Sequence, residues 1–167
     1  MSQPDPAAMN WSTENCTIGR AMAILGERWT VVVLREIFNG IRRFDQIHDH
    51  AGTPKQVLTN RLAMLCDMGV LVRHPYREPG ERERHEYRLT AMGFDVYPVL
   101  VAVREWGDRY LADLEGAPAA MLHRDCGASV GVHLVCAAGH HIDSPHDVVT
   151  TPGPGARAAA LPRTRDA

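Results

Sequence analysis

The stretch "TPKQVLTNRLAMLCDMGVLVR", residues 53–73, has the pattern of a helix that is followed at once by a strand. Thr53 is a residue type that caps helix N-termini, and Pro54 suits the first helical position. Gln56 stands where a capping box places its second member, and Gly69 suits the left-handed position after a helix. These signals predict a helix of about fifteen residues, because start and stop signals bound an apolar-periodic segment of that length.

The predicted helix has two different sides on a helical wheel. The apolar side consists of Val57, Leu58, Leu62 and Leu65. The polar side consists of Gln56, Thr59, Asn60, Ala63 and Asp67, with Lys55 and Cys66 at its border. Arg61 falls toward the apolar side, so we expect it to lie along the boundary or to pair with an acid. Several groups on the polar side can form hydrogen bonds with a flat polar partner, which raises the question of what this side binds.

Three further helices are expected before this one. The segments are "CTIGRAMAILG" (16–26), "ERWTVVVLREIFNG" (27–40) and a short helix within "RRFDQIHDHAG" (42–52), which Gly52 ends. The valine run of the second segment would also suit a buried strand, but its length and the spacing of Trp29, Val33 and Ile37 favour a helix. Inward positions there are Trp29, Val32, Val33, Ile37 and Phe38.

A β-hairpin is expected after the helix, over residues 69–90. Val70 and Val72 alternate with polar residues on the first strand, and Pro79-Gly80 supplies the turn. Pro75 marks the first strand as an edge strand, because proline cannot donate to a ladder. The rim of the hairpin is basic, with Arg73, Arg77, Arg82, Arg84 and Arg88.

Residues 90–116 are expected to form one long helix. Its apolar residues recur at three- and four-residue steps, and its length is about 37 Å at 1.5 Å per residue. Pro98 should kink this helix or lie near an early turn. A small domain can hardly cover such a stripe, so a partner helix is expected, most simply from a second copy of the chain.

This order of elements predicts an α+β fold that is mostly α, a winged helix-turn-helix with a long C-terminal dimerisation helix and a small C-terminal appendage. The second helix of the motif would enter the major groove of DNA, and wing arginines would contact phosphates or the minor groove. The predicted DNA-binding residues are Arg42, Arg43, Thr53, Lys55, Gln56, Thr59, Asn60, Arg77, Arg82 and Arg84. The alternative is an ordinary amphipathic helix with a solvated face. The adjacent basic hairpin favours DNA.

Three stretches together resemble the HxlR-type transcriptional regulators, bacterial winged-helix proteins related to the MarR group. They are "CTIGRAMAILGERWTVVVLREIFNGIRRFDQI", "TPKQVLTNRLAMLCDMGVLVR" and "HEYRLTAMGFDVYPVLVAVREWG", between Cys16 and Gly107. The resemblance implies a homodimer joined through the first and last helices of the domain. It also implies binding to an inverted-repeat operator in double-stranded DNA. One departure is Thr17, where the family usually has proline after the cysteine.

Composition is that of a globular protein, with 45% hydrophobic and 23% charged residues among 167. The net charge is −2, but residues 20–90 carry +3 and residues 91–167 carry −3, so the middle is modestly basic. No apolar run long enough for a membrane span and no secretory signal is visible, which predicts a cytoplasmic protein. Cysteines in that compartment are thiols, metal ligands or redox sensors.

Two cysteine features have a possible function. The resemblance assigns Cys16 a position where some relatives sense oxidants or electrophiles, and a helix N-terminus favours the reactive thiolate. A small apolar residue at the dimer seam is the other interpretation. In the tail, His123, Cys126, Cys136 and either His140 or His141 have a spacing similar to a degenerate zinc ribbon. A metal-free hairpin at residues 128–136, "ASVGVHLVC", is preferred, because Gly139 stands where a further cysteine would fall.

Four segments are expected along the chain. They are a flexible N-terminus (1–13), the DNA-binding and dimerisation domain (14–116), a small His/Cys module (117–150) and a disordered tail (151–167). The sequence predicts a dimeric DNA-binding regulator, a repressor released by a small-molecule effector or a redox signal, that requires no cofactor. The alternative is a protein-binding winged-helix module with a zinc-ribbon-like tail. An enzyme is not expected, because no catalytic pair and no phosphate-binding loop is present.

Overall fold

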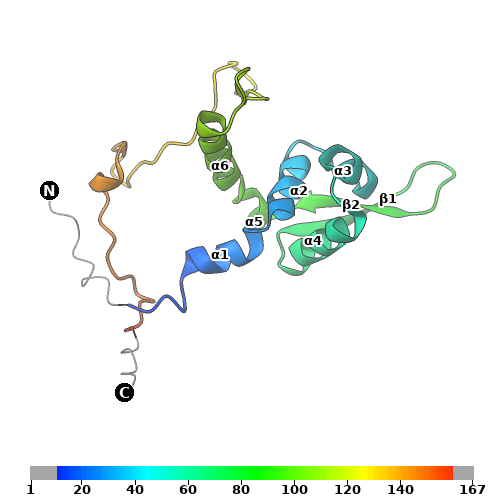
Figure 1. Ribbon diagram of the computed structural model, residues 1–167. Coiled ribbons are helices and arrows are strands. Elements are labelled where there is room, and N and C mark those ends of the chain that lie inside the picture. Colours follow the sequence, from blue (N-terminus) through cyan, green and yellow to red (C-terminus); the bar gives the residue numbers. More distant parts are fainter. Residues whose placement is uncertain (1–10, 160–167) are drawn as a thin grey trace. The chain divides into compact units, whose positions relative to one another are not determined.

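A computed structural model describes residues 11–159 of the chain (Figure 1). Its contacts divide these residues into two compact units, one of residues 24–132 and one of residues 11–23 together with 133–159. The segment expected as one module, 117–150, contributes residues to both units. Parts of the two ends that were predicted to be flexible or disordered, 1–10 and 160–167, lie outside the described residues.

The larger unit has the element order of a winged helix-turn-helix, which confirms the predicted fold class. Its elements are the end of α1 (Thr17–Leu25), then α2 (Arg28–Phe38), α3 (Phe44–Ala51), α4 (Lys55–Asp67), β1 (Leu71–Tyr76), β2 (Arg84–Leu89), α5 (Ala91–Phe94) and α6 (Tyr97–Tyr110). The valine run of α2 is helical, as its spacing indicated. Within residues 11–159, no helix is both long and apolar enough to cross a bilayer.

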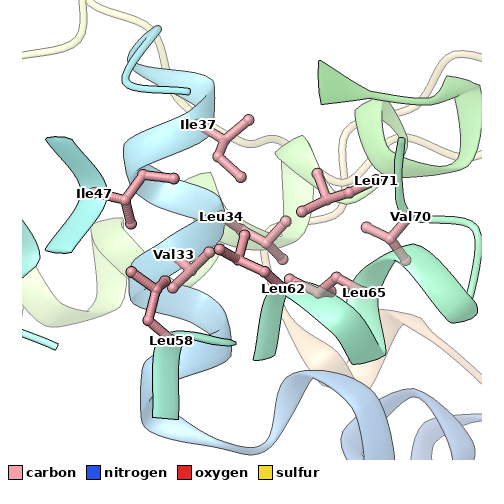
Figure 2. Close-up of a cluster of buried hydrophobic side chains, with 9 residues drawn as sticks. All are labelled: Val33, Leu34, Ile37, Ile47, Leu58, Leu62, Leu65, Val70 and Leu71. Atoms are coloured by element: carbon pink, nitrogen blue, oxygen red, sulfur yellow. The ribbon is translucent and has the colours of Figure 1, made fainter. Parts of the chain in front are cut away.

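The hydrophobic core lies where α2, α3 and α4 meet (Figure 2). Its buried side chains are Val33, Leu34, Ile37, Ile47, Leu58, Leu62, Leu65, Val70 and Leu71. Burying an aliphatic side chain of this size contributes about 1.5–3 kcal/mol. Because α2 supplies three of these residues and contacts both α3 and α4, it is the helix against which the helix-turn-helix is assembled.

Two glycines end helices as predicted, but the predicted capping box is wrong. Gly52 and Gly69 both have left-handed backbones, with φ of 64° and 73°. Helix α4 begins at Lys55 with Pro54 as its N-cap residue and no capping side chain. Thr53 is instead fully buried, and its hydroxyl has no hydrogen-bond partner in the described part of the chain. Thr53 is therefore a buried residue of the turn before α4 and not a cap.

The hairpin forms the wing, and β2 is its inner strand. β1 and β2 pair antiparallel, from Leu71 opposite Leu89 to Tyr76 opposite Arg84. A bridge between Arg43 and Glu86 lies on the other side of β2, which leaves Pro75 on the edge strand as predicted. The structure corrects which residue of β1 points inward.

Leu71, and not Val72, is the buried residue at the start of β1; Val72 is 49% exposed. Val70 lies in the turn that follows α4, where it is also buried. Leu71 is the one fully buried residue of β1, so the alternation predicted from Val70 and Val72 is wrong for this strand.

The single long helix predicted for residues 90–116 is divided and shorter. α5 ends at Phe94, α6 begins at Tyr97, and Pro98 lies in the first turn of α6. Proline has no N–H with which to continue the α5 ladder, but it is tolerated at the start of a new helix. Helix α6 ends at Tyr110, so the apolar stripe is about 21 Å long at 1.5 Å per residue.

The smaller unit holds its ends together through backbone contacts. Trp11 forms a bridge with Ala158, and the backbone N–H of Ser12 donates to the carbonyl oxygen of Arg157 at 2.7 Å. A short 3-10 helix, η2 (Pro145–Asp147), is the regular element after residue 132 in the described chain. Residues 128–136 do not form the expected hairpin. Ser129 bridges to Leu122 and Val135 to His141, so the segment belongs to two separate turns.

Thr90 and Gly93 join the wing to the end of α4. The Thr90 hydroxyl donates to the carbonyl oxygen of Gly69 at 2.6 Å and accepts from the backbone N–H of Gly93 at 3.1 Å. A Cβ atom added at Gly93 would lie 2.3 Å from the carbonyl oxygen of Val70. The Val70 backbone cannot move away without opening this junction. Glycine is therefore required at position 93, because a larger residue has no space for its Cβ atom.

Gly93→Ala is expected to lower the free energy of unfolding by about 1–3 kcal/mol, because the added methyl group overpacks the junction. Gly107→Ala is the matched control, since a Cβ there meets no atom within 4 Å and lies inside helix α6. The control should be neutral or more stable by up to about 1 kcal/mol. Urea unfolding followed by circular dichroism measures both, and equal effects would contradict the steric explanation.

Candidate nucleic-acid interface

The exposed face of α4 is polar and close to the start of the helix. Lys55, Gln56, Thr59 and Asn60 are all exposed, while Leu58, Leu62 and Leu65 anchor the opposite face in the core. The four polar residues thus project from a rigid helix.

Two hydrogen bonds order this face. The Gln56 side-chain amide donates to Asn60 Oδ1 at 2.9 Å, and Thr59 Oγ1 donates to the carbonyl oxygen of Lys55 at 2.9 Å. The Gln56–Asn60 pair leaves one amide oxygen and several N–H groups facing outward. These donors and acceptors are suited to a planar partner with its own hydrogen-bonding edge.

The wing carries the predicted arginines on its exposed loop and second strand. Arg77 donates through Nε to the carbonyl oxygen of Glu81 at 3.0 Å, and Arg84 lies 3.6 Å from Asp45 and 3.4 Å from Glu81. Arg82 is exposed and forms no ion pair with any residue between 11 and 159. Of the three predicted wing contacts Arg77, Arg82 and Arg84, Arg82 therefore has the guanidinium that is most available to an anion.

Arg42 and Arg43, which are adjacent, differ in their surroundings. Arg42 is exposed, and its carbonyl oxygen accepts from the backbone N–H of Tyr87 at 2.8 Å. The Arg43 guanidinium lies 2.5 Å from Glu78 and 4.2 Å from the centre of the Tyr76 ring. The hydrogen bond with Glu78 raises the pKa of Arg43. Arg43 is thus already engaged by the wing.

Thr53 does not belong to the exposed face. Its side chain, in the turn that joins α3 to α4, is fully buried, so it cannot contact a macromolecule in this structure. Thr53 was one of the DNA-binding residues predicted from the sequence. Arg61 lies at the edge of α4 as expected, with its guanidinium 3.8 Å from Glu27.

A buried carboxylate, which the sequence did not reveal, holds α3 against α2. Glu36 is fully buried, its Oε1 accepts from Arg35, and His50 Nδ1 lies 2.6 Å from its Oε2. Burying a charge is costly unless it is paired, and removing one partner of such a pair is destabilising. Because His50 is near the end of α3, this pair sets the position of the helix-turn-helix. Nothing in the local sequence distinguishes Glu36 from an ordinary exposed acid.

Cys16 and Cys66 have different environments. Cys16 is exposed directly before α1, and the backbone N–H of Gly19 donates to its sulfur at 3.5 Å. Cys66 is half-buried, and burial raises the pKa of its thiol. A raised pKa lowers the thiolate fraction, so the Cys66 thiol is less reactive than an ordinary exposed thiol.

The four predicted metal ligands occur as two local pairs. His123 Nδ1 lies 3.2 Å from Cys126 Sγ in the larger unit. In the smaller unit, backbone N–H groups of His140 and Ala138 lower the pKa of the Cys136 thiol. No cluster of three or more His, Cys, Asp or Glu side chains suited to a metal occurs in the described residues.

A largely apolar cavity of about 350 Å³ lies between α2, α6 and the segment 119–121, all within the larger unit. Apolar side chains from α2 and α6, among them Val31, Phe38 and Leu100, form much of its lining. Arg35 and Arg104 also line it, and Arg104 donates to the carbonyl oxygen of Ala119, which holds the segment in place. The volume suits a small organic molecule.

Another face of α6 is apolar and exposed. Val99, Val103, Trp106 and Tyr110 recur at helical spacing and are 44–62% exposed, and the two aromatic rings lie 5.7 Å apart. Leu100 and Val101, on a different side of the same helix, face the core and the cavity, and Val103 at the edge of the stripe also lines the cavity. A stripe of large apolar side chains is rarely left exposed in a monomer.

Known proteins resemble the chain over most of its length. The sequence profile described as HxlR-like helix-turn-helix matches residues 24–115. An uncharacterised HTH-type transcriptional regulator of Mycobacterium tuberculosis is 42% identical over 146 residues, which are 87% of this chain and 90% of the relative.

Solved structures agree with this resemblance. PA1607, described as a transcription factor, superposes with a TM-score of 0.75 at 28% identity, over 84% of this chain and 96% of its own. A regulator of the MarR family from Porphyromonas gingivalis has a TM-score of 0.51 at 26% identity, over 60% and 97% of the two chains.

Proposed function

The chain belongs to the HxlR-like helix-turn-helix family of transcriptional regulators, and from this premise we propose that it is a dimeric, sequence-specific DNA-binding repressor. The observation that carries the proposal is the exposed amide and hydroxyl face at the start of α4, beside a basic wing. A small molecule or a redox signal releases the repressor from its operator.

Base readout belongs to α4 in this proposal. The major groove, roughly 12 Å wide, admits one helix, and glutamine and asparagine amides bond adenine edges in pairs. Gln56 and Asn60 would supply such contacts, and Lys55 would reach a guanine edge or a phosphate. Arg42 and the wing arginines Arg77, Arg82 and Arg84 would contact phosphates or the minor groove, and these contacts make affinity depend on salt.

Gln56→Ala and Asn60→Ala should each reduce discrimination between a selected duplex and a random one, by about 1–3 kcal/mol. Arg82→Ala should weaken binding to both duplexes equally and reduce the slope of log affinity against log salt by about one. The selected duplex comes from a randomised library enriched with the wild-type protein, and fluorescence anisotropy at several salt concentrations measures binding.

Equal effects of the three substitutions on both duplexes would contradict this division of roles. Weak wild-type binding that does not respond to salt would favour the alternative, a winged-helix module that binds protein.

The exposed stripe of α6 supports the dimer. Its four large side chains need cover, and a second copy of the same helix supplies an equally apolar surface. The family resemblance implies a homodimer joined through the first and last helices of the domain, α1 and α6. Two α4 helices related by a twofold axis would then reach successive half-sites of an inverted repeat.

Val103→Glu should convert the dimer to a monomer, because the new carboxylate would be buried without a partner at the interface. Val72→Glu is the matched control, since Val72 on β1 and Val103 on α6 are similarly exposed, at 49% and 55%. Light scattering after size exclusion gives the mass of each variant. A wild-type monomer, or a dimer that both substitutions leave intact, would exclude this interface.

Two features could receive the releasing signal. The cavity beside α6 touches α2, whose other side packs on α3 and α4, so a ligand there would change the angle between the dimer helix and the DNA-reading helix. The exposed thiol of Cys16 stands at the start of α1, where oxidation or alkylation would add bulk or charge. Either event would shift the population between two spacings of the recognition helices.

Cys16→Ser should abolish any loss of DNA binding caused by diamide or by a quinone, while Cys126→Ser, which removes another exposed thiol, should retain it. Binding to the selected duplex before and after treatment measures the response. A full response in the Cys16→Ser protein would exclude Cys16 as the sensor and leave the cavity as the candidate receptor.

A further inference from the structure

Arg43 lies at the junction between α3 and the wing and contacts the wing in two ways. Its guanidinium carbon lies 4.2 Å from the centre of the Tyr76 ring, at the end of β1. Its Nη1 lies 2.5 Å from Oε1 of Glu78, two residues further into the wing loop. One side chain from the helix-turn-helix thus holds both the end of a strand and the start of the loop.

The backbone supports the same junction. Arg43 forms a bridge with Glu86 on β2, and the Tyr87 N–H donates to the Arg42 carbonyl oxygen. A second ion pair of opposite polarity joins the same two parts, with Arg84 of β2 3.6 Å from Asp45 of α3. The base of the wing is therefore fixed by backbone contacts, whereas the direction of the loop depends on side chains.

We propose that Arg43, Tyr76 and Glu78 form a clamp that positions the wing loop on DNA, and that Arg43 is a positioning residue and not a phosphate contact. This inference rests on the proposed function, because the loop needs a defined direction only if it meets a partner. Glu78 gives the strongest support for the clamp, because its charge is unfavourable for DNA binding. An acid at a DNA-facing loop repels phosphates, so its presence is explained by what it holds.

The clamp orients Arg82, four residues beyond Glu78. Arg82 is an exposed arginine of the wing loop that forms no ion pair among the described residues, and it lines a hollow of about 370 Å³ together with Arg43 and Tyr76. With the loop held, the Arg82 guanidinium is presented from a fixed position. With the loop released, the same contact with phosphate would require ordering of the loop on binding, and affinity would fall.

Removal of the Glu78 charge distinguishes the clamp from simple electrostatics, because the two explanations predict opposite changes in DNA affinity. Glu78→Gln removes a negative charge and, as electrostatics alone, should tighten DNA binding. As the loss of the clamp, it should weaken binding by about three- to tenfold, a range that corresponds to a modest surface interaction. Glu83→Gln is the matched control, since it removes the same charge from an exposed position of the same loop without touching Arg43.

The experiment measures affinity for the selected duplex and for a random duplex, at fixed salt, with the full-length protein. We expect Glu78→Gln to weaken binding to both and Glu83→Gln to leave binding unchanged or tighter. Arg82→Ala should cost less affinity in the Glu78→Gln background than in the wild type, and Arg43→Gln should add little to Glu78→Gln.

Tighter binding by Glu78→Gln, equal to that of Glu83→Gln, would overturn the clamp. So would a further large loss when Arg43→Gln is combined with Glu78→Gln, because Arg43 would then contact DNA itself. Failure of the proposed function looks different, since the wild-type protein itself would then show no salt-dependent binding to either duplex.

Discussion

The packing of α2 against α3 and α4 is the constraint on which the rest of the structure depends. Val33, Leu34 and Ile37 of α2 are buried, and α3 and α4 dock on them. Burial at about 1.5–3 kcal/mol for each side chain outweighs the contributions of exposed polar contacts in this unit. The Glu36–His50 pair fixes the orientation of α3 on α2, since a buried carboxylate accepts few arrangements of its partners. The polar face of α4 is exposed as a consequence.

Charged groups around the proposed interface divide into those that are available and those that are already engaged. Arg82 is exposed, whereas Arg43 is bound by Glu78 and Tyr76. A surface ion pair contributes typically less than about 1 kcal/mol, so the wing loop is held only lightly. Light restraint suits a loop that must adapt to a groove, because stronger restraint would exclude small adjustments and no restraint would add an ordering cost to binding.

Helix α6 serves different partners on different sides. One side faces the core and the cavity next to α2, and the stripe that contains Trp106 and Tyr110 is exposed. In the proposed dimer this helix therefore lies between the second copy and the cavity. A ligand in the cavity would act on the helix that joins the two copies, and α2 would transmit the change to the recognition helix. Pro98 is compatible with this arrangement, since it starts a separate helix that need not continue the direction of α5.

Helical spacing and turn residues were sufficient to predict the order of elements from α1 to the wing, and the polar residues of α4 were correctly expected on an exposed face. These features are local, because periodicity of three to four residues and glycine at left-handed positions depend only on neighbours along the chain. The residues Lys55, Gln56, Thr59 and Asn60 could therefore be named as the candidate site from the sequence alone.

The tertiary structure decided what depends on distant partners. Thr53 has the residue type of a cap but is fully buried, and Glu36 has the type of an exposed acid but is buried and paired with His50. Arg43 was expected at DNA, yet its partners Tyr76 and Glu78 come from a strand and loop more than thirty residues away. A residue's type states which contacts it can make, whereas only packing determines which partner comes within reach.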